Sequence, residues 1–140
     1  MLMEIKIKKL HPDAKAPIHA TSGSAGFDIY ALKDIVLEPG TTTIVPTGVA
    51  FEIPPEYYVR IEDRSGMAIK GIHKVAGIID SDYRGEVGIV LHNSNKEPYK
   101  IEKHNRIAQG ILTPVNQANF VESELSDTER GTGGFHSTGK

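Results

Sequence analysis

Short β-branched segments, separated by proline and glycine, constrain the fold of this chain more than any other feature. Apolar and polar residues alternate with period two at residues 5–8, and strand-like runs recur at 57–62, 86–92 and 106–115. Eight prolines and fourteen glycines separate these runs at intervals of about ten residues. This spacing is typical of a β-sandwich or barrel, so we expect an all-β fold.

Proline and glycine also predict where strands end. The runs 41–48 and 49–53 are β-branched, but Pro46 and Gly48 lie within them. Proline lacks the N–H that a strand ladder requires, and glycine weakens the interior of a strand. We therefore expect this stretch to be interrupted at both positions.

One short helix and a change in composition complete the predicted organisation. Residues 64–71 have helical character over about two turns, with Ser65 as a candidate cap and Gly71 as a candidate end. The chain becomes polar near residue 116. We expect one compact all-β body over residues 1–115 and a C-terminal arm over 116–140.

The composition limits the possible partners and location. The formal net charge is −2, which argues against a general nucleic-acid or membrane binder, although a local anion site needs only a few arginines. The chain has no cysteine, no apolar run of 18 residues and no charged-then-apolar leader, so we expect a cytoplasmic protein. Its six histidines show no metal-ligand spacing.

Two polar islands between the strands are candidates for binding chemistry. In AGFDIYA, Asp28 stands in an otherwise apolar strand; it can orient a metal-bound water, or simply accept backbone N–H groups at a strand end. In DRSGMA, the guanidinium of Arg64, the hydroxyl of Ser65 and the amide of Gly66 can together hold an anion. The plainer alternative is a serine cap beside a surface arginine.

A third island lies in residues 77–93, which we interpret as a β-hairpin with Gly85 at its turn. Asp80 directly follows the apolar pair 78–79, which we expect to be buried. A carboxylate there can take a proton from water, although aspartates on turns are usually turn formers. Tyr83 lies close enough in sequence to form a wall beside it.

Two further islands complete the set. Gln109 is a polar amide in a strand that otherwise reads as buried, so it needs partners from the protein or from a ligand. The glycine-rich end of the chain carries Arg130, Phe135, Ser137 and Thr138, which suit a terminal phosphate and a stacked base. Such tails are more often solvated termini. Together the islands describe a site for a base, a sugar and several phosphates.

Five segments in order resemble the five motifs of the trimeric deoxyuridine triphosphate nucleotidohydrolases (dUTPases). They span residues 25 to 139 and read AGFDIYA, DRSGMA, GIIDSDYRG, RIAQG and RGTGGFHSTG. The resemblance implies a homotrimer of jelly-roll-like, distorted β-barrel subunits with one short helix. It also implies hydrolysis of dUTP to dUMP and pyrophosphate with Mg²⁺, which keeps uracil out of DNA and supplies dUMP for dTMP synthesis.

The same resemblance implies a role for each candidate residue. Asp80 would be the general base for the water that attacks the α-phosphorus, and Asp28 would lie in the water shell of a metal without a direct protein ligand. The groups that would bind uracil and deoxyribose are Gly77, Ile79, Tyr83, Gly88 and Phe135. Those that would bind phosphates are Arg64, Ser65, Gly66, Gln109, Arg130, Ser137 and Thr138.

The tail motif, residues 130–139, would close as a lid over a neighbouring subunit's site and become ordered on the nucleotide. Three positions depart from the family pattern. Asp63 adds a negative charge beside the phosphate loop, so we expect its side chain to point away. His136 stands where glycine is usual, and residues 104–105 replace a common Gly-Asp pair.

Two alternatives remain open from the sequence. A dCTP deaminase-like enzyme would share the fold, but it would need a glutamate base and a pocket for the cytosine amino group. A β-rich regulatory or structural module would bind nucleotide without turnover, or dock onto another protein. Asp80, Tyr83 and the Phe135 lid favour dUTP hydrolysis over both.

Overall fold

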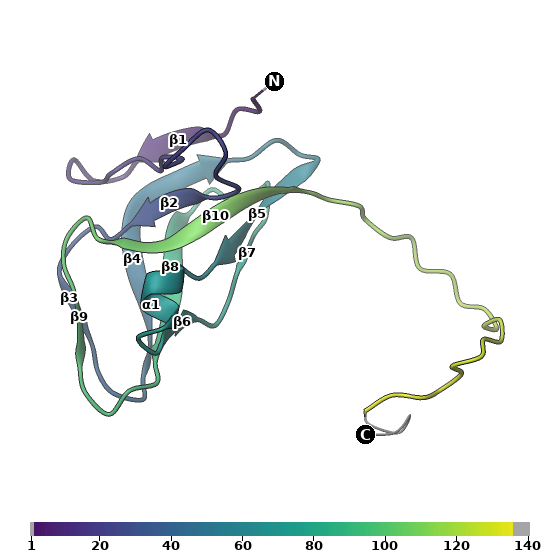
Figure 1. The fold of residues 1–140 in the computed structure, drawn as a ribbon. Coiled ribbons are helices and arrows are strands. Elements are labelled where there is room, and N and C mark those ends of the chain that lie inside the picture. The colour runs from purple at the N-terminus through teal and green to yellow at the C-terminus, as the bar shows by residue number, and fades with distance from the viewer. Residues whose placement is uncertain (1, 136–140) are drawn as a thin grey trace.

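The computed structural model describes residues 2–135 and is nearly all β, as predicted (Figure 1). One four-residue helix, α1 (Ser65–Ala68), interrupts the strands. The strands are β1 (Lys6–Lys9), β2 (Phe27–Tyr30), β3 (Ile35–Leu37), β4 (Thr42–Glu52), β5 (Tyr57–Glu62), β6 (Ile72–Lys74), β7 (Ile78–Ile79), β8 (Glu86–Asn93), β9 (Tyr99–Ile101) and β10 (Arg106–Pro114).

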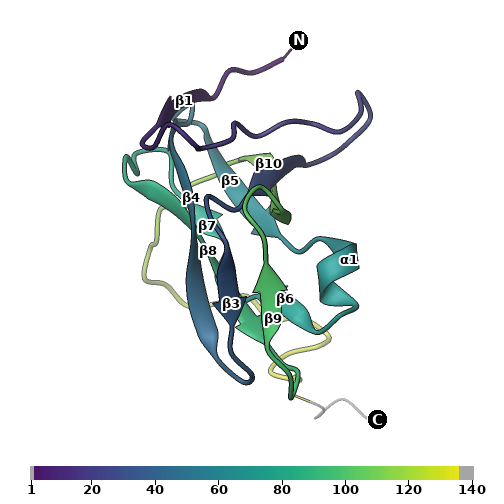
Figure 2. The ribbon, with the colours of Figure 1, turned by 90° about the vertical axis from the view of Figure 1, so that its left-hand side faces the viewer.

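Two four-stranded sheets and a two-stranded ribbon make up the body. The first sheet has the order β1-β4-β8-β6, the second β2-β10-β5-β7, and β3 pairs with β9. Every strand pairing is antiparallel, and the ribbon closes one side of the body (Figure 2). Residues from all three layers are almost fully buried in one core, including Ile29, Leu37, Val59, Ile89 and Ile107.

The predicted interruption of residues 41–53 is wrong, because β4 runs without a break from Thr42 to Glu52. The register against β8 shifts between Pro46 and Ala50, which is the signature of a β-bulge. Gly48 takes a φ of +72°, and its N–H donates to the Glu86 carboxylate at 2.8 Å. Proline and glycine are tolerated inside this strand because the bulge relaxes the ladder where they occur.

The helix is shorter than predicted and is capped differently. The N-cap position is Arg64, with no side-chain cap hydrogen bond, so the predicted Ser65 cap is wrong. Ser65 is the first helical residue, and its carbonyl accepts a bond from Ile69 at 3.0 Å. Gly71, with a φ of +81°, follows the helix and turns the chain into β6, as a terminating glycine does.

The chain leaves the body after β10. The N–H of Val115 donates to the carbonyl of Glu56 at 2.8 Å, and residues 116–135 then extend away from the sheets (Figure 1). Their apolar side chains are exposed, including Phe120 at 93% and Leu125 at 91%. Among the described residues, no helix has the length and apolar character needed to cross a membrane.

Candidate active site

A groove opens where β7 and β8 separate. β6 and β8 are paired up to the bond from the Val75 N–H to the Val90 carbonyl, at 3.1 Å. Beyond that point, β7 pairs with β5 in the second sheet, while β8 remains with β4 in the first. The predicted hairpin over 77–93 is therefore wrong, because β7 pairs with β5 and not with β8. The strand edges that face each other across the gap are not paired with one another.

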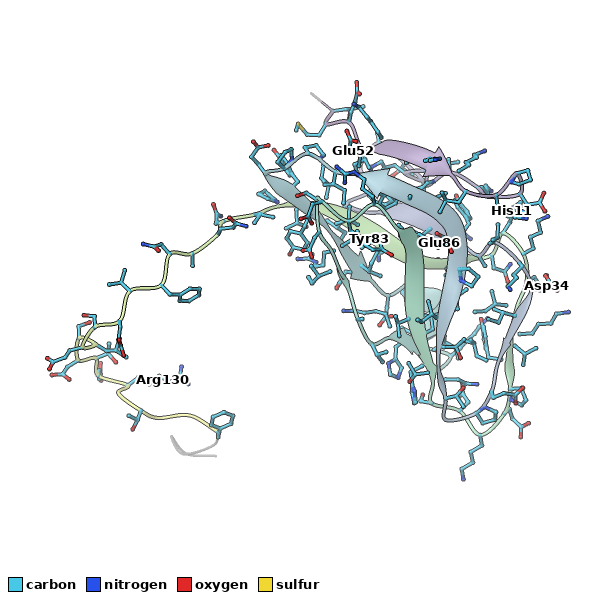
Figure 3. The ribbon with its side chains drawn as sticks, turned by 180° about the vertical axis from the view of Figure 1, so that it is seen from behind. His11, Asp34, Glu52, Tyr83, Glu86 and Arg130 are labelled. Atoms are coloured by element: carbon cyan, nitrogen blue, oxygen red, sulfur yellow. The ribbon has the colours of Figure 1, made fainter. Side chains whose placement is uncertain are left out.

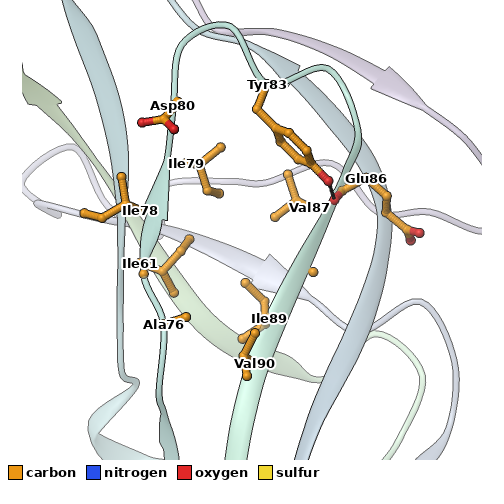
Figure 4. Close-up of a pocket in the computed structure, with 12 residues that line it drawn as sticks. Ile61, Ala76, Ile78, Ile79, Asp80, Tyr83, Glu86, Val87, Ile89 and Val90 are labelled. Atoms are coloured by element: carbon orange, nitrogen blue, oxygen red, sulfur yellow. Dashed lines mark hydrogen bonds between the residues drawn. The ribbon is translucent and has the colours of Figure 1, made fainter.

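The groove is a pocket of about 280 Å³ with an apolar floor and a polar mouth (Figure 4). Ile79, Val87 and Ile89 line it and are buried, whereas Ile78 is 64% exposed, so only half of the apolar pair 78–79 is buried as predicted. The lining includes the body residues predicted to bind uracil and sugar, which are Gly77, Ile79, Tyr83 and Gly88, and it also includes Asp80, the predicted general base.

The turn between β7 and β8 fixes the ring of Tyr83 beside Asp80. The Tyr83 N–H donates to the Asp80 carbonyl at 3.2 Å, and the Tyr83 hydroxyl donates to the Glu86 carbonyl at 2.8 Å. A Cβ added to Gly85 would lie 2.6 Å from the Tyr83 Cζ. The φ of Gly85 is not positive, so glycine is not needed here for its backbone conformation. Glycine is needed because it lets the tyrosine ring lie against the backbone. The Asp80 carboxylate stays exposed at the mouth.

A second polar region forms around the segment before α1. The Gln109 Nε2 donates to the Asp63 carbonyl at 2.8 Å, which is a structural partner for this half-buried amide. The Asp63 carboxylate accepts from the Lys74 N–H at 2.6 Å, so it turns toward β6, away from the helix start, as expected. Because an amide nitrogen carries two N–H groups, Gln109 keeps one donor for a ligand.

Asp28 and Gln109 are direct cross-strand partners on β2 and β10, which places their side chains on the same face. A Cβ on Gly26 would lie 2.6 Å from the Gln109 Oε1, so glycine is required for the amide to fit. Burial raises the pKa of the neighbouring Tyr30 hydroxyl, and the negative charge of Asp28 raises it further.

Arg106 was missed in the sequence, where it reads only as the start of a strand. Its carbonyl accepts from the Arg64 Nη1 at 3.0 Å, and both arginines line a polar pocket of about 220 Å³. Two guanidinium groups on one pocket favour an anion such as a phosphate. The available signal was the arginine that opens RIAQG, but its hydrogen bond with Arg64 spans 42 residues of sequence.

The tail residues lie apart from the groove of their own chain. The Arg130 Nε donates to the Gly133 carbonyl at 2.7 Å in a local turn, and Figure 3 places Arg130 far from Tyr83. Phe135 has a φ of 51° and is fully exposed. Ser137 and Thr138, as well as the departure at His136, lie outside the described residues. The structure thus gathers Gly77, Ile79, Asp80, Tyr83 and Gly88 around one groove, whereas Arg64 lines a separate pocket and Arg130 and Phe135 line neither.

Comparison with known proteins shows the family to which the chain belongs. The dUTPase family model matches residues 12–139. The deoxyuridine 5'-triphosphate nucleotidohydrolase of Nautilia profundicola is 48% identical over 142 residues, which cover 99% of this chain and 100% of that protein. The enzyme of the same name from Clostridioides difficile is 44% identical, with 99% of each chain covered.

Solved structures share the fold. A variant of the staphylococcal phage 80alpha dUTPase superposes with a TM-score of 0.89 at 28% identity, over 98% of this chain and 99% of that one. A variant of the dUTPase of S. aureus phage phi11, described with a structural Mg(II) ion, gives 0.84 at 24% identity, over 90% and 100%. The predicted jelly-roll-like fold is confirmed, and the chain belongs to the dUTPase family.

Proposed function

We infer that this chain hydrolyses dUTP to dUMP and pyrophosphate, and that the groove between β7 and β8 is where it does so. The observation that carries the assignment of the site is the separation of these two strands, with Asp80 and Tyr83 at the mouth of the gap. The apolar floor suits the faces of a planar base, and unpaired strand edges offer backbone donors and acceptors to its rim.

We propose that Asp80 is the general base. Its carboxylate takes a proton from a water molecule as the water oxygen forms a bond to the α-phosphorus. The bond from that phosphorus to the oxygen bridging to the β-phosphorus breaks, so pyrophosphate leaves and dUMP remains. An exposed carboxylate at the mouth of a pocket can reach a water beside a bound phosphate chain.

Tyr83 selects the sugar and the strands select the base. The tyrosine ring is held at both ends, through its backbone N–H and its hydroxyl, so it cannot easily move aside for a 2′-hydroxyl. Gly77, Ile79 and Gly88 bring backbone close to the uracil rim in a slot too narrow for a thymine methyl. A rigid wall of this kind discriminates by about 1–3 kcal/mol.

The phosphates extend from the groove toward the start of α1 in this proposal. Arg64, Ser65, Gly66 and Gln109 hold them, and the position of Arg106 beside Arg64 adds a second guanidinium to the set. The tail supplies the rest: Phe135 stacks over uracil, and Arg130, Ser137 and Thr138 hold the γ-phosphate.

We propose Mg²⁺ as the cofactor. This ion commonly keeps several waters and binds through substrate phosphates with one or two carboxylates. Within residues 2–135, no three histidine, aspartate or glutamate side chains gather into a metal cluster, whereas Asp28 places a single carboxylate beside Gln109. That arrangement fits an ion held by phosphates and water, with Asp28 in its water shell. When bound, the ion neutralises charge on the phosphates.

We further propose that residues 1–115 form the body and 116–140 an arm that completes a neighbour's site in a homotrimer. Support comes from the direction of residues 116–135, which leave their own groove behind and carry exposed apolar side chains. We propose a cytoplasmic location, which is consistent with dUTP as the substrate and with a chain that has no cysteine. We propose no nucleic-acid or membrane partner.

Product analysis with dUTP, dTTP, dCTP and UTP, each with and without Mg²⁺, tests this function. Of the four nucleotides, we expect only dUTP to release pyrophosphate at a high rate, and only when Mg²⁺ is present. UTP should be poor because of Tyr83, and dTTP because of the slot. Ammonia release from dCTP would identify a deaminase instead, and binding of dUTP without any product would identify a regulatory module.

A further inference from the structure

Two histidines lie side by side on the outer face of the first sheet. His73 on β6 and His92 on β8 are direct cross-strand partners, so both side chains leave the sheet on the same face. Their ring centroids are 5.5 Å apart, and the rings are tilted by 52°. Both side chains are half-buried, and neither lines the nucleotide groove. The proposed reaction gives this pair no role.

Thr42, His92 and His73 lie opposite one another on three adjacent strands, and Thr42 is a hydrogen-bond partner of the His92 ring. Thr42 on β4 pairs with His92 across the strands, and its hydroxyl lies 3.0 Å from the His92 Nδ1. In the tautomer whose Nδ1–H donates to this hydroxyl, the Nε2 of His92 carries a free lone pair. Metal-binding histidines are commonly oriented in this way, by a hydrogen bond from the nitrogen that does not bind the ion.

We propose that His73 and His92 form a two-histidine site for a divalent transition-metal ion of the Zn²⁺, Ni²⁺ and Cu²⁺ class. Imidazole nitrogen suits these ions, whereas Mg²⁺ and Ca²⁺ prefer oxygen. Metal–nitrogen bonds of about 2.0–2.1 Å place two imidazole centroids about 5 Å apart around a tetrahedral ion. The observed 5.5 Å therefore needs only a small rotation of the side chains.

The framework around the pair is rigid, which favours binding. β8 lies inside its sheet, with β4 on one side and β6 on the other, so the two histidine Cβ positions are held by ladders. The next row on this face is Val75 opposite Val90. The site is thus bounded by an apolar row on one side, with Thr42 beside His92, and water completes the coordination of the ion.

Calorimetric titration of Ni²⁺ and Zn²⁺ into the full chain, with excess Mg²⁺ and without nucleotide, tests the site. We expect one ion per chain, and binding at least about 10-fold weaker in His73→Ala and in His92→Ala. Thr42→Val should weaken it by about 10- to 100-fold, because the orienting hydrogen bond is lost. His11→Ala removes an exposed histidine elsewhere and should leave binding unchanged.

Two further measurements separate loss of a ligand from damage to the sheet. His73→Asn and His92→Asn keep a polar side chain, and circular dichroism checks their folding. In the parent chain, substoichiometric Ni²⁺ should broaden the NMR signals of these two imidazoles before those of the other four. Absence of binding by the parent, unchanged affinity in either alanine variant, or earlier broadening of other histidines overturns the proposal.

Discussion

In the body, the apolar side chains of Ile29 and Ile107 are each 1% exposed, whereas in the arm Phe120 and Leu125 are more than 90% exposed. Burying such a side chain contributes about 1.5–3 kcal/mol. The body has gained that stabilisation within one chain, and residues 116–135 have not. The difference supports the proposal that the body folds without the arm, and that the arm docks on a surface outside its own chain.

The same contrast divides the proposed active site. Asp80 and Tyr83 are held by a turn of the body, with three ordered backbone and side-chain contacts around them. Phe135 is held only by its own local chain in the described structure and is fully exposed. In the proposed mechanism, the catalytic groups therefore lie on a fixed frame, and the lid groups lie on a segment that becomes ordered with a ligand or a neighbouring subunit.

The largest effect we expect is on catalysis, from a body residue whose side chain is exposed. Asp80→Asn keeps the shape of the side chain but removes its proton acceptor, so dUTP turnover should fall by about 10²- to 10⁴-fold. Asp82→Asn changes the next exposed aspartate of the same turn and serves as the control. Pyrophosphate release measures both. Near-parent turnover by the Asp80 variant would remove Asp80 from the mechanism.

The converse change removes the lid and leaves the body whole. A chain ending at Glu129 should lose about 10²-fold in turnover, because substrate positioning is lost. Its urea unfolding midpoint should match that of the parent, since Phe135, the large apolar side chain of residues 130–135, is fully exposed. A marked drop in the midpoint would show that the tail is part of the folded core, and the contrast between the regions would fail.

Glycine substitutions compare the two regions directly. A Cβ on Gly110 in β10 would lie 2.5 Å from the Phe27 ring, so Gly110→Ala should lower the free energy of unfolding by about 1–3 kcal/mol. Gly131 has a φ of +56°, and a Cβ there would lie no closer than 4.0 Å to its neighbour, the Thr128 carbonyl oxygen. Gly131→Ala should leave unfolding unchanged and affect turnover instead. Equal losses of stability from both changes would contradict the division.

The smallest effect concerns a surface contact that ties loops of the body together. A hydrogen bond from Lys103, at 3.0 Å, and its positive charge lower the pKa of the Asp13 carboxyl below its usual range. A lowered carboxyl pKa stabilises the fold above the unfolded pKa, and this is lost as pH falls through the folded pKa. Lys103→Met should therefore be slightly less stable than the parent at pH 7, and the difference should shrink as the pH falls below 3.8 and through the lowered pKa of Asp13.

Urea unfolding of both chains between pH 7 and pH 3 measures this difference. Lys100→Met, on an exposed lysine of β9, is the control and should show no such dependence. A difference between Lys103→Met and the parent that stays constant with pH would mean that Lys103 acts through packing and not through Asp13.

The local pattern of residues predicted most of the strands, and the five motifs could be read directly from the sequence. The turn that joins Asp80 to Tyr83 was also accessible, because its donors and acceptors lie within a few residues. What could not be predicted depends on distant pairing. Residues 77–93 have the local pattern of a hairpin, and only the presence of β5 draws β7 away from β8. The groove between β7 and β8 could therefore not be predicted from the local sequence.

Other features that the local sequence did not predict also depend on pairing between distant segments. Pro46 and Gly48 mark an interruption by local rules, but pairing with β8 on both sides of a bulge keeps β4 continuous. His73 and His92 have no ligand-like spacing, yet strand register makes them neighbours. Likewise, the position of Arg106 beside Arg64 follows from the tertiary fold, not from either motif alone.

The central claim, that the body of one chain and the arm of another form each active site, is tested most directly by mixing two inactive chains. One is Asp80→Ala with an intact tail, and the other is the chain ending at Glu129. The two chains are unfolded together in equal amounts and then refolded. They should form random trimers in which each site takes its general base, Asp80, from one chain and its lid from another.

Half of the sites then receive an intact Asp80 and, independently, half receive an intact tail. We expect pyrophosphate release to recover to about a quarter of the parent rate, from two preparations that are inactive alone. If base and lid come from the same chain, no mixed trimer contains a complete site. Mixed trimers confirmed by mass that show no recovery of activity would contradict the shared site.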